Sequence, residues 1–244
     1  MLVASGPELY TALADLGWHQ MLAEIPEVAV PLVFRLLGET GAHAPLLNDV
    51  LRDSIGRPAI ESVPLPFAGG RWVLWEEIGG GSSAIDAELP IREVPAGDEI
   101  PLAVGRRALG WWLVGTSRAM LALAKTHAMH RVQFDRPVAS FQAVRHRLAE
   151  ALVATEGAEA TLQAADSDLG ALLAKAAAGR AALTAARHCQ QVLGGIGFTA
   201  EHDLHRHIRR VLVLDCLLGS SRELIRDAGA MLRTTGNAPR LVHL

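Results

Sequence analysis

Cysteine is scarce in this sequence, and long apolar runs are missing. The 244 residues contain two cysteines, Cys189 and Cys216, whose separation fits neither a metal site nor a disulfide framework, so we expect two reduced, buried thiols. Arg118, Lys125 and Asp215 interrupt the most apolar stretches before they reach the ~18 residues that a membrane-spanning helix needs. These absences exclude a disulfide-stapled domain and an integral membrane protein.

An excess of charge of either sign is also lacking. The formal net charge is −3, which argues against a nucleic-acid partner bound mainly by electrostatics. The residues are 50% hydrophobic and only 20% charged, a balance that excludes disorder and predicts apolar surface buried between subunits. Residues 1–8 show no basic stretch followed by an apolar one, so no secretory signal is visible and a cytoplasmic location is expected.

Three regions differ in their residue pattern. Leucines recur at helical spacing in residues 1–51, where a further helix is expected to start near Leu32. Residues 52–101 are rich in proline and glycine, which excludes long helices, and the segment 71–76 is typical of a strand. This middle region is too short for a large sheet core of its own. Residues 102–244 are again helical in pattern.

The third region is predicted to form a bundle of long antiparallel helices. Ser167 and Asp168 provide the cap of one helix, and the glycines that follow residue 193 end it. Short turns between helices of this length are typical of a bundle, so the predicted fold class is mainly α with a C-terminal four-helix bundle. The expected helices cover residues 102–130, 139–165, 168–193, a segment from 201, and 220–233.

Two segments of this region carry residues suited to a phosphate ligand. The guanidinium of Arg131 is able to donate the paired hydrogen bonds that a diphosphate accepts, although an arginine at a helix C-terminus is by itself more often a partner of the helix dipole. The glycines of residues 194–197 would let a backbone approach a phosphate closely, although glycines after a helix are more often caps. Neither segment alone identifies a site.

The two segments hold the motifs Arg131-x-x-Phe134-x-x-Pro137 followed by Gln142, and Gln191-x-x-Gly194-Gly195-x-Gly197-Phe198. Taken together, these motifs resemble the C-terminal domain of the acyl-CoA dehydrogenase family. The resemblance spans residues 102–231, and residues 12–18 and 36–41 weakly resemble pieces of the family's N-terminal helical domain. It implies a flavoprotein fold with a helical N-terminal domain, a middle β domain and a C-terminal four-helix bundle through which subunits dimerise.

The resemblance implies that these motifs bind FAD held mainly by a neighbouring subunit. In the family, the first motif contacts the neighbour's flavin, and the Gln-x-x-Gly-Gly loop cradles the ADP part of the same cofactor. Asp135 departs from the pattern, because the family usually has glycine there and an acid repels a phosphate unless Arg131 or Arg136 offsets it. The implied cofactor-binding residues are Arg131, Phe134, Gln142, Gln191, Gly194 and Gly195.

The general base of the family is missing from this sequence. The resemblance places Leu218 where the family has the glutamate that takes the α-proton of an acyl-CoA thioester, and leucine cannot take a proton. The alternative base position, within residues 104–108, holds no carboxylate either. Residues 52–101 contain no counterpart of the segments that contact the flavin ring, and the nearest string, residues 79–83, is interpreted as a turn.

These features predict a shortened, non-catalytic subunit of a heteromeric, FAD-dependent acyl-CoA dehydrogenase. Its helical region 1–51 and β region 52–101 would be reduced, and a longer homologue would supply the glutamate, the flavin-ring contacts and most of the acyl-CoA pocket. The resemblance favours an α2β2 assembly that acts on a steroid side-chain CoA thioester and shares its FAD between subunits. Two alternatives stay open: a flavin-free structural or regulatory homo-oligomer, and a self-sufficient homodimeric flavoenzyme with an unrecognised base.

The histidines are interpreted as surface or interface residues. A metal site in a helical bundle of the di-metal type needs several inward Glu-x-x-His units, and the sequence contains none, so no metal site is expected. The histidines concerned are His127 and His130, one helical turn apart, and the cluster His202, His205 and His207.

Four carboxylates form the other grouping of ionisable residues. They are expected on a solvated helix face and at a helix terminus rather than as a catalytic pair. They are Glu156, Glu159, Asp166 and Asp168.

Overall fold

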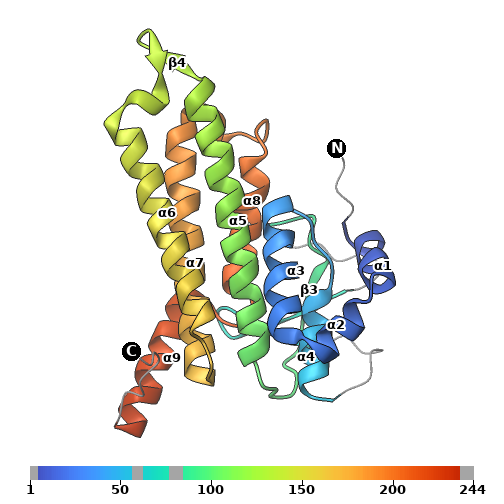
Figure 1. The fold of residues 1–244 in the computed structure, drawn as a ribbon. Coiled ribbons are helices and arrows are strands. Elements are labelled where there is room, and N and C mark those ends of the chain that lie inside the picture. Colours follow the sequence, from blue (N-terminus) through green and yellow to red (C-terminus); the bar gives the residue numbers. More distant parts are fainter. Residues whose placement is uncertain (1–4, 57–62, 77–84, 237–244) are drawn as a thin grey trace.

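Short helices make up the N-terminal part of the chain. The computed structural model describes residues 5–56, 63–76 and 85–236. In the first of these ranges the helices pack around the lower half of a long central helix, α5 Ala103–His130 (Figure 1). Their bounds are α1 Pro7–Asp15, α2 Trp18–Glu24, α3 Pro26–Thr40 and α4 Leu46–Ser54.

The start of α3 differs from the sequence-based expectation. The helix begins at Pro26 and not near Leu32, because proline fits the first helical position, where its missing N–H leaves no hydrogen bond unmade. Phe34 and Leu37 face the core, whereas Leu32 and Leu36 are exposed. The prediction relied on the leucine spacing and therefore placed the helix start too late in the chain.

A small antiparallel sheet follows the N-terminal helices. The predicted strand at 71–76 is confirmed, and it lies between two others in the order β1-β2-β3. Leu65 pairs with Val73 and Trp75 pairs with Ile91, and all four side chains are buried on the face toward the helices. The turn expected at residues 79–83 lies outside the described residues. The strands are β1 Leu65–Phe67, β2 Arg71–Trp75 and β3 Ile91–Val94.

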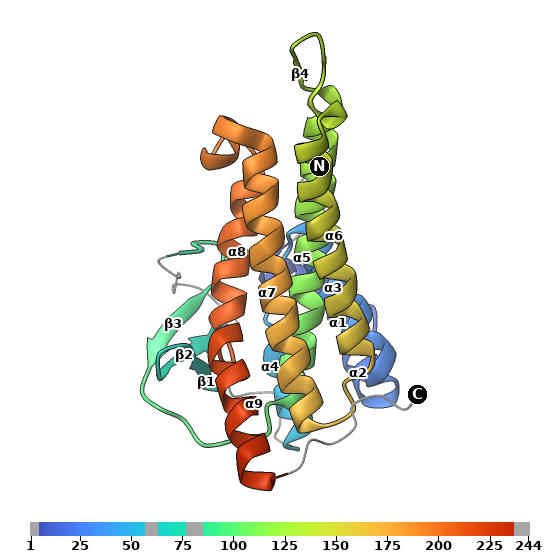
Figure 2. The same cartoon turned by 90° about the vertical axis from the view of Figure 1, so that its left-hand side faces the viewer.

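The long helices of the C-terminal part lie side by side, which confirms the predicted mainly α fold class with a terminal bundle (Figures 1 and 2). The short α9 continues the line of the bundle past the lower end of α8 (Figure 2). Among the described residues, no helix is long and apolar enough to cross a lipid bilayer. Besides α5, the helices are α6 Gln142–Gln163, α7 Asp168–Leu193, α8 Leu204–Cys216 and α9 Ser221–Thr235.

Local signals set most of the helix starts in the bundle. The Ser167 side chain caps α7, as its sequence predicts. Helix α6 begins at Gln142 and not at residue 139, because the short 3-10 helix η1 Val138–Ser140 comes first. Helix α8 begins at Leu204 and not at residue 201, because a turn follows the 3-10 helix η2 Gly194–Phe198.

A chain of aromatic rings joins the three parts of the molecule. Trp18 of α2 lies 6.4 Å from Phe34 of α3, Phe34 lies 5.8 Å from Trp112 of α5, and Trp112 stacks at 5.6 Å on Trp75 of β2. All four side chains are fully buried, and each ring removes a large apolar area from water. The N-terminal helices, the sheet and the bundle therefore share one core.

Helices α3 and α5 touch through their backbones. A Cβ atom added to Gly38 would collide with the backbone of Trp112 and Thr116, and a Cβ added to Gly115 would collide with the backbone of Arg35. Side chains normally hold packed helices ~8–10 Å apart, so only glycine at these two positions permits this approach. The contact fixes α5 against the N-terminal helices.

We expect Gly115→Ala to lower the free energy of unfolding by ~1–3 kcal/mol, because the added methyl group must push α3 and α5 apart. Gly157→Ala in α6 is the matched control, since no neighbouring atom lies within 4 Å of its Cβ position, and it should stabilise the helix by up to ~1 kcal/mol. Urea unfolding of both variants measures the difference. Equal stabilities would contradict the backbone contact.

Candidate functional site

A tight hairpin between α5 and α6 presents the first predicted motif. Its strands β4 Val132–Gln133 and β5 Arg136–Pro137 are joined by Phe134 and Asp135, which have left-handed φ values of 54° and 61°. Two such residues are typical of a type I′ turn. Asp135 thus forms the turn in place of the glycine expected there, and the strained Phe134 is held 86% exposed at the tip.

Arg131 lies between α5 and this hairpin. Its backbone N–H donates to the carbonyl of His127 at 2.9 Å, and its own carbonyl accepts from Val138 at 2.8 Å, so the backbone position is fixed. Its guanidinium is exposed and has no hydrogen-bond partner among the described residues. Gln142, at the start of α6, is also exposed, and its Nε2 lies 3.4 Å from His146 Nε2.

The second motif ends α7 at the same end of the bundle as the hairpin (Figures 1 and 2). Gln191 is exposed there, and Gly194 adopts a left-handed φ of 64° that ends the helix. Gly197 packs against the backbone of Gln190, so both of these glycines serve the local fold. Gly195 differs, because a Cβ atom at this position would meet open space and its φ is not left-handed.

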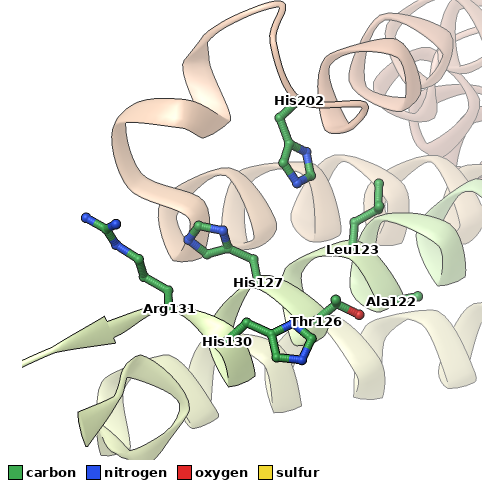
Figure 3. A pocket seen from close by; sticks show the side chains of 7 residues that line it. All are labelled: Ala122, Leu123, Thr126, His127, His130, Arg131 and His202. Atoms are coloured by element: carbon green, nitrogen blue, oxygen red, sulfur yellow. The ribbon is translucent and has the colours of Figure 1, made fainter. Parts of the chain in front are cut away.

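An open groove of about 530 Å³ lies beside Arg131 of the first motif. His127, His130 and Arg131 line it from the last turn of α5, and His202 lines it from the segment that leads from η2 into α8 (Figure 3). The structure thus brings Arg131 to the connection that follows the glycine loop. The groove is not lined by the other predicted residues, which are Phe134, Gln142, Gln191, Gly194 and Gly195.

Leu218 lies near the opposite end of α5. It is fully buried with a left-handed φ of 57°, and its backbone N–H donates to the carbonyl of Pro66 at 2.8 Å. Its carbonyl accepts from Arg106 Nε at 3.2 Å, and its side chain packs over Gly105. The 26 helical steps from Gly105 to Arg131 correspond to roughly 39 Å at ~1.5 Å per residue, so Leu218 and Arg131 belong to different ends of the molecule.

A buried lysine, which the sequence reasoning missed, holds the Leu218 segment. Lys175 of α7 donates to the carbonyls of Asp215 and Gly219 at 2.5 Å each. Burial lowers its pKa to about 8, against the partly compensating charge of Asp215. The available signal was a lone lysine within the alanine-rich stretch of this helix.

The structure corrects two expectations about surface ionisable groups. Glu159 is not on a fully solvated face, because it pairs with Arg118 at 2.5 Å. His207 is half-buried, and burial followed by the charge of Arg210 lowers its pKa to about 4. Arg210 is itself buried and pairs with Asp86 at 2.6 Å, a link between α8 and the 85–89 segment that the sequence did not reveal.

Within the described ranges, no three histidine, cysteine or acidic residues are grouped to hold a metal ion.

The two cysteines are free thiols, but only one of them is fully buried. Burial raises the pKa of Cys189 to about 12, which makes this thiol unreactive at neutral pH. Cys216 is half-buried, so the expectation of a buried thiol is wrong for this residue.

Comparison with known proteins assigns the bundle. Residues 99–231, just over half of the chain, match the family model described as acyl-CoA dehydrogenase, C-terminal domain. The chain therefore belongs to the acyl-CoA dehydrogenase family.

The curated relatives are similar to part of this chain. Acyl-CoA dehydrogenase FadE34 of Mycobacterium tuberculosis is 39% identical over 127 residues, which are 48% of this chain and 18% of that protein. Acyl-CoA dehydrogenase IpdE2 of the same organism is 39% identical over 116 residues, which are 46% of this chain and 36% of that protein. The chain thus matches well under half the length of either relative.

Solved structures share the fold over nearly the whole chain. A chain of the ChsE4–ChsE5 complex from Mycobacterium tuberculosis aligns with a TM-score of 0.71 and 19% identity, covering 97% of this chain and 90% of that one. A chain of a Tcur3481–Tcur3483 steroid ACAD variant aligns with a TM-score of 0.73 and 19% identity, covering 96% and 90%. Identities this low show a common fold only.

We expect Lys175→Met to remove a pH dependence from the folding stability. The pKa of Lys175 is about 8 in the folded chain against an ordinary value of 10.5, so the folded state binds fewer protons between these values. Stability therefore rises with pH through this window, by at most ~1.4 kcal/mol per pH unit, and is lost as pH falls toward 8.

The control for this prediction is Lys125→Met, the same change at an exposed position of α5. Chemical unfolding at pH 8 and 10.5 gives the change in stability for each variant. Lys175→Met also leaves the carbonyls of Asp215 and Gly219 without their lysine donor. This loss of stability is the same at both pH values, so it does not affect the difference in stability between them. If Lys175→Met kept the pH-dependent gain of the unmodified chain, Lys175 would not be the buried group described here.

Proposed function

We propose that this chain is a subunit of a heteromeric, FAD-dependent acyl-CoA dehydrogenase and completes the cofactor site of a longer partner subunit. The partner carries the glutamate that takes the α-proton in the α,β-dehydrogenation of an acyl-CoA thioester. The observation that carries this proposal is the exposed guanidinium of Arg131, without a partner among the described residues, at the groove between the end of α5 and His202.

The groups at this end of the bundle fit a diphosphate. An exposed guanidinium fork is able to donate two parallel, charge-assisted hydrogen bonds, worth ~1.5–3 kcal/mol each. Among the described residues, Gly195 has no packing neighbour, and it has no left-handed backbone that would require glycine, so close approach of another molecule explains its lack of a side chain. Three further exposed residues at the same end of the bundle complete the proposed contacts, namely Phe134, Gln142 and Gln191.

The separation between the two ends of α5 supports a division of labour. The position expected for the base is filled by Leu218, and its surroundings are Gly105 and Leu51, which are apolar. An extended dinucleotide is shorter than the roughly 39 Å from Gly105 to Arg131, so one flavin cannot serve both ends of this chain. A flavin held at Arg131 therefore places its ring outside this chain's own Leu218 pocket.

Exposed apolar side chains at the motif end support a partner surface. Phe134 at the hairpin tip and Phe198 of η2 are 86% and 68% exposed, and Met129 and Val132 are also exposed. Large apolar groups gathered on one surface of a protein mark an interaction site. Docking of a partner at this end would cover these side chains and enclose the cofactor between the two subunits.

The names of two structural neighbours support a proposal for the assembly and the class of substrate. The ChsE4–ChsE5 structure is a complex, and the Tcur3481–Tcur3483 structure is described as a steroid ACAD. By analogy, we propose an α2β2 assembly in the cytoplasm that acts on a steroid side-chain CoA thioester. Bound flavin supplies the two-electron acceptor for this dehydrogenation, while the residues of this chain bind and orient the cofactor.

We expect Arg131→Ala to lower the flavin content of the complex that forms when this chain and its longer partner are co-expressed. Loss of a charge-assisted fork on the diphosphate should weaken flavin retention by roughly tenfold or more. Gly195→Leu should have a similar effect by filling the path of approach, without a cost to folding, because its surroundings are open. Flavin absorbance per mole of complex measures both effects.

Arg233→Ala is the control, because Arg233 is an exposed arginine in the last turn of α9, at the far end of the bundle from the hairpin (Figure 1). Flavin content equal to that of this control in both test variants would mean that the motif assignment is wrong. A stable assembly without any flavin would instead support the structural homo-oligomer.

A further inference from the structure

Three histidines line the groove beside Arg131, and the proposed function gives them no role. His127 and His130 come from the last turn of α5, and His202 faces them across the groove (Figure 3). No carboxylate is among the described residues that line the groove. Every ionisable group on its walls is therefore cationic or able to become so.

The ring of His202 is held in a defined orientation. The backbone N–H of Leu204 donates to His202 Nδ1 at 3.1 Å, and the His202 carbonyl lies 2.9 Å from His205 Nδ1. Because Nδ1 accepts a hydrogen bond, the neutral ring carries its proton on Nε2. His202 therefore presents an N–H donor whose direction is fixed by its own backbone segment.

His127 lies edge-on to His202, with the ring centroids 6.4 Å apart. Burial lowers the pKa of His127, and the neighbouring His202 and Arg131 lower it further. A positive environment of this kind opposes protonation of His127 and attracts an anion. Two charged or titratable groups lie on the same side of the groove as His127: His130 in the same helix and Arg131 directly after it. Across the groove lies His202, with the exposed Glu201 and Asp203 on either side of it in the sequence.

We propose that His127 and His202, together with Arg131, form one binding site for a diphosphate group. Arg131 supplies the permanent charge, His202 donates from Nε2, and His127 donates from the opposite wall. The identity of the natural ligand rests on the proposed function, in which this group is the diphosphate of the partner's flavin. A free nucleotide diphosphate presents the same chemistry to the groove.

The first test is calorimetric titration of the full chain with inorganic diphosphate. His127→Ala and His202→Ala should each weaken binding by about five- to tenfold, because each removes one donor to a charged oxygen. His19→Ala is the matched control, since His19 is an exposed histidine on α2, distant from the groove (Figure 1). Affinities equal to that of the control in both variants would overturn the proposal.

The second test separates contact with the ligand from a structural role. Histidine ring resonances followed by NMR should report a higher pKa for His127 when inorganic diphosphate is present, because the bound anion stabilises the imidazolium. The resonances of His19 should be unchanged. A histidine that only supports the fold would keep the same pKa with and without diphosphate, and that result would also overturn the proposal.

The complex with the partner identifies the source of the diphosphate. If His127→Ala and His202→Ala also release flavin from the complex, the flavin is the ligand. If they weaken inorganic diphosphate binding but retain flavin, the site takes a free phosphate compound. If Arg131→Ala releases flavin while the histidine variants change neither flavin nor diphosphate binding, the proposed function stands and the inference about the histidines fails.

Discussion

The backbone contact between α3 and α5 fixes the position of the central helix, against which the other elements pack. Because Gly38 and Gly115 lack side chains, the two helices touch, and Trp112 one turn earlier stacks within the aromatic core shared with the sheet. The N-terminal helices and the strands therefore hold α5 along its lower half. Gly105 and Arg131 therefore lie near the two ends of a single rigid helix.

The two ends of α5 differ in how their polar groups are satisfied. Around Leu218, backbone groups pair with Pro66 and Arg106, and Lys175 pairs with two further carbonyls, so these polar groups have their partners within the chain. Around Arg131, a guanidinium and several imidazole groups face an open groove. The proposed anionic ligand would give this cation and these potential N–H donors a common partner, since no carboxylate is among the described residues that line the groove.

Local sequence signals predicted much of this fold. The serine cap at Ser167 and the alternating strand at 71–76 were found because the deciding residues are neighbours along the chain. The roles of Lys175 and Arg210 were missed, because their partners lie 40 or more residues away in sequence. The same limit applies to the site: motif spacing predicted Arg131, whereas its neighbour across the groove, His202, is brought there only by the path of the chain after α7.

In the proposed assembly this chain completes a flavin site held mainly by its partner, and the number of flavins in the assembly decides whether it does so. Purification of the native complex, followed by quantitation of each chain and of released FAD, gives this number. We expect about one flavin for each pair of unlike subunits, and no flavin on this chain when it is purified alone, because the residues proposed to hold the cofactor lie only at the Arg131 end and Leu218 occupies the position expected for the base. Two flavins for each pair, or a flavin retained by this chain alone, would show that the chain holds a flavin site of its own.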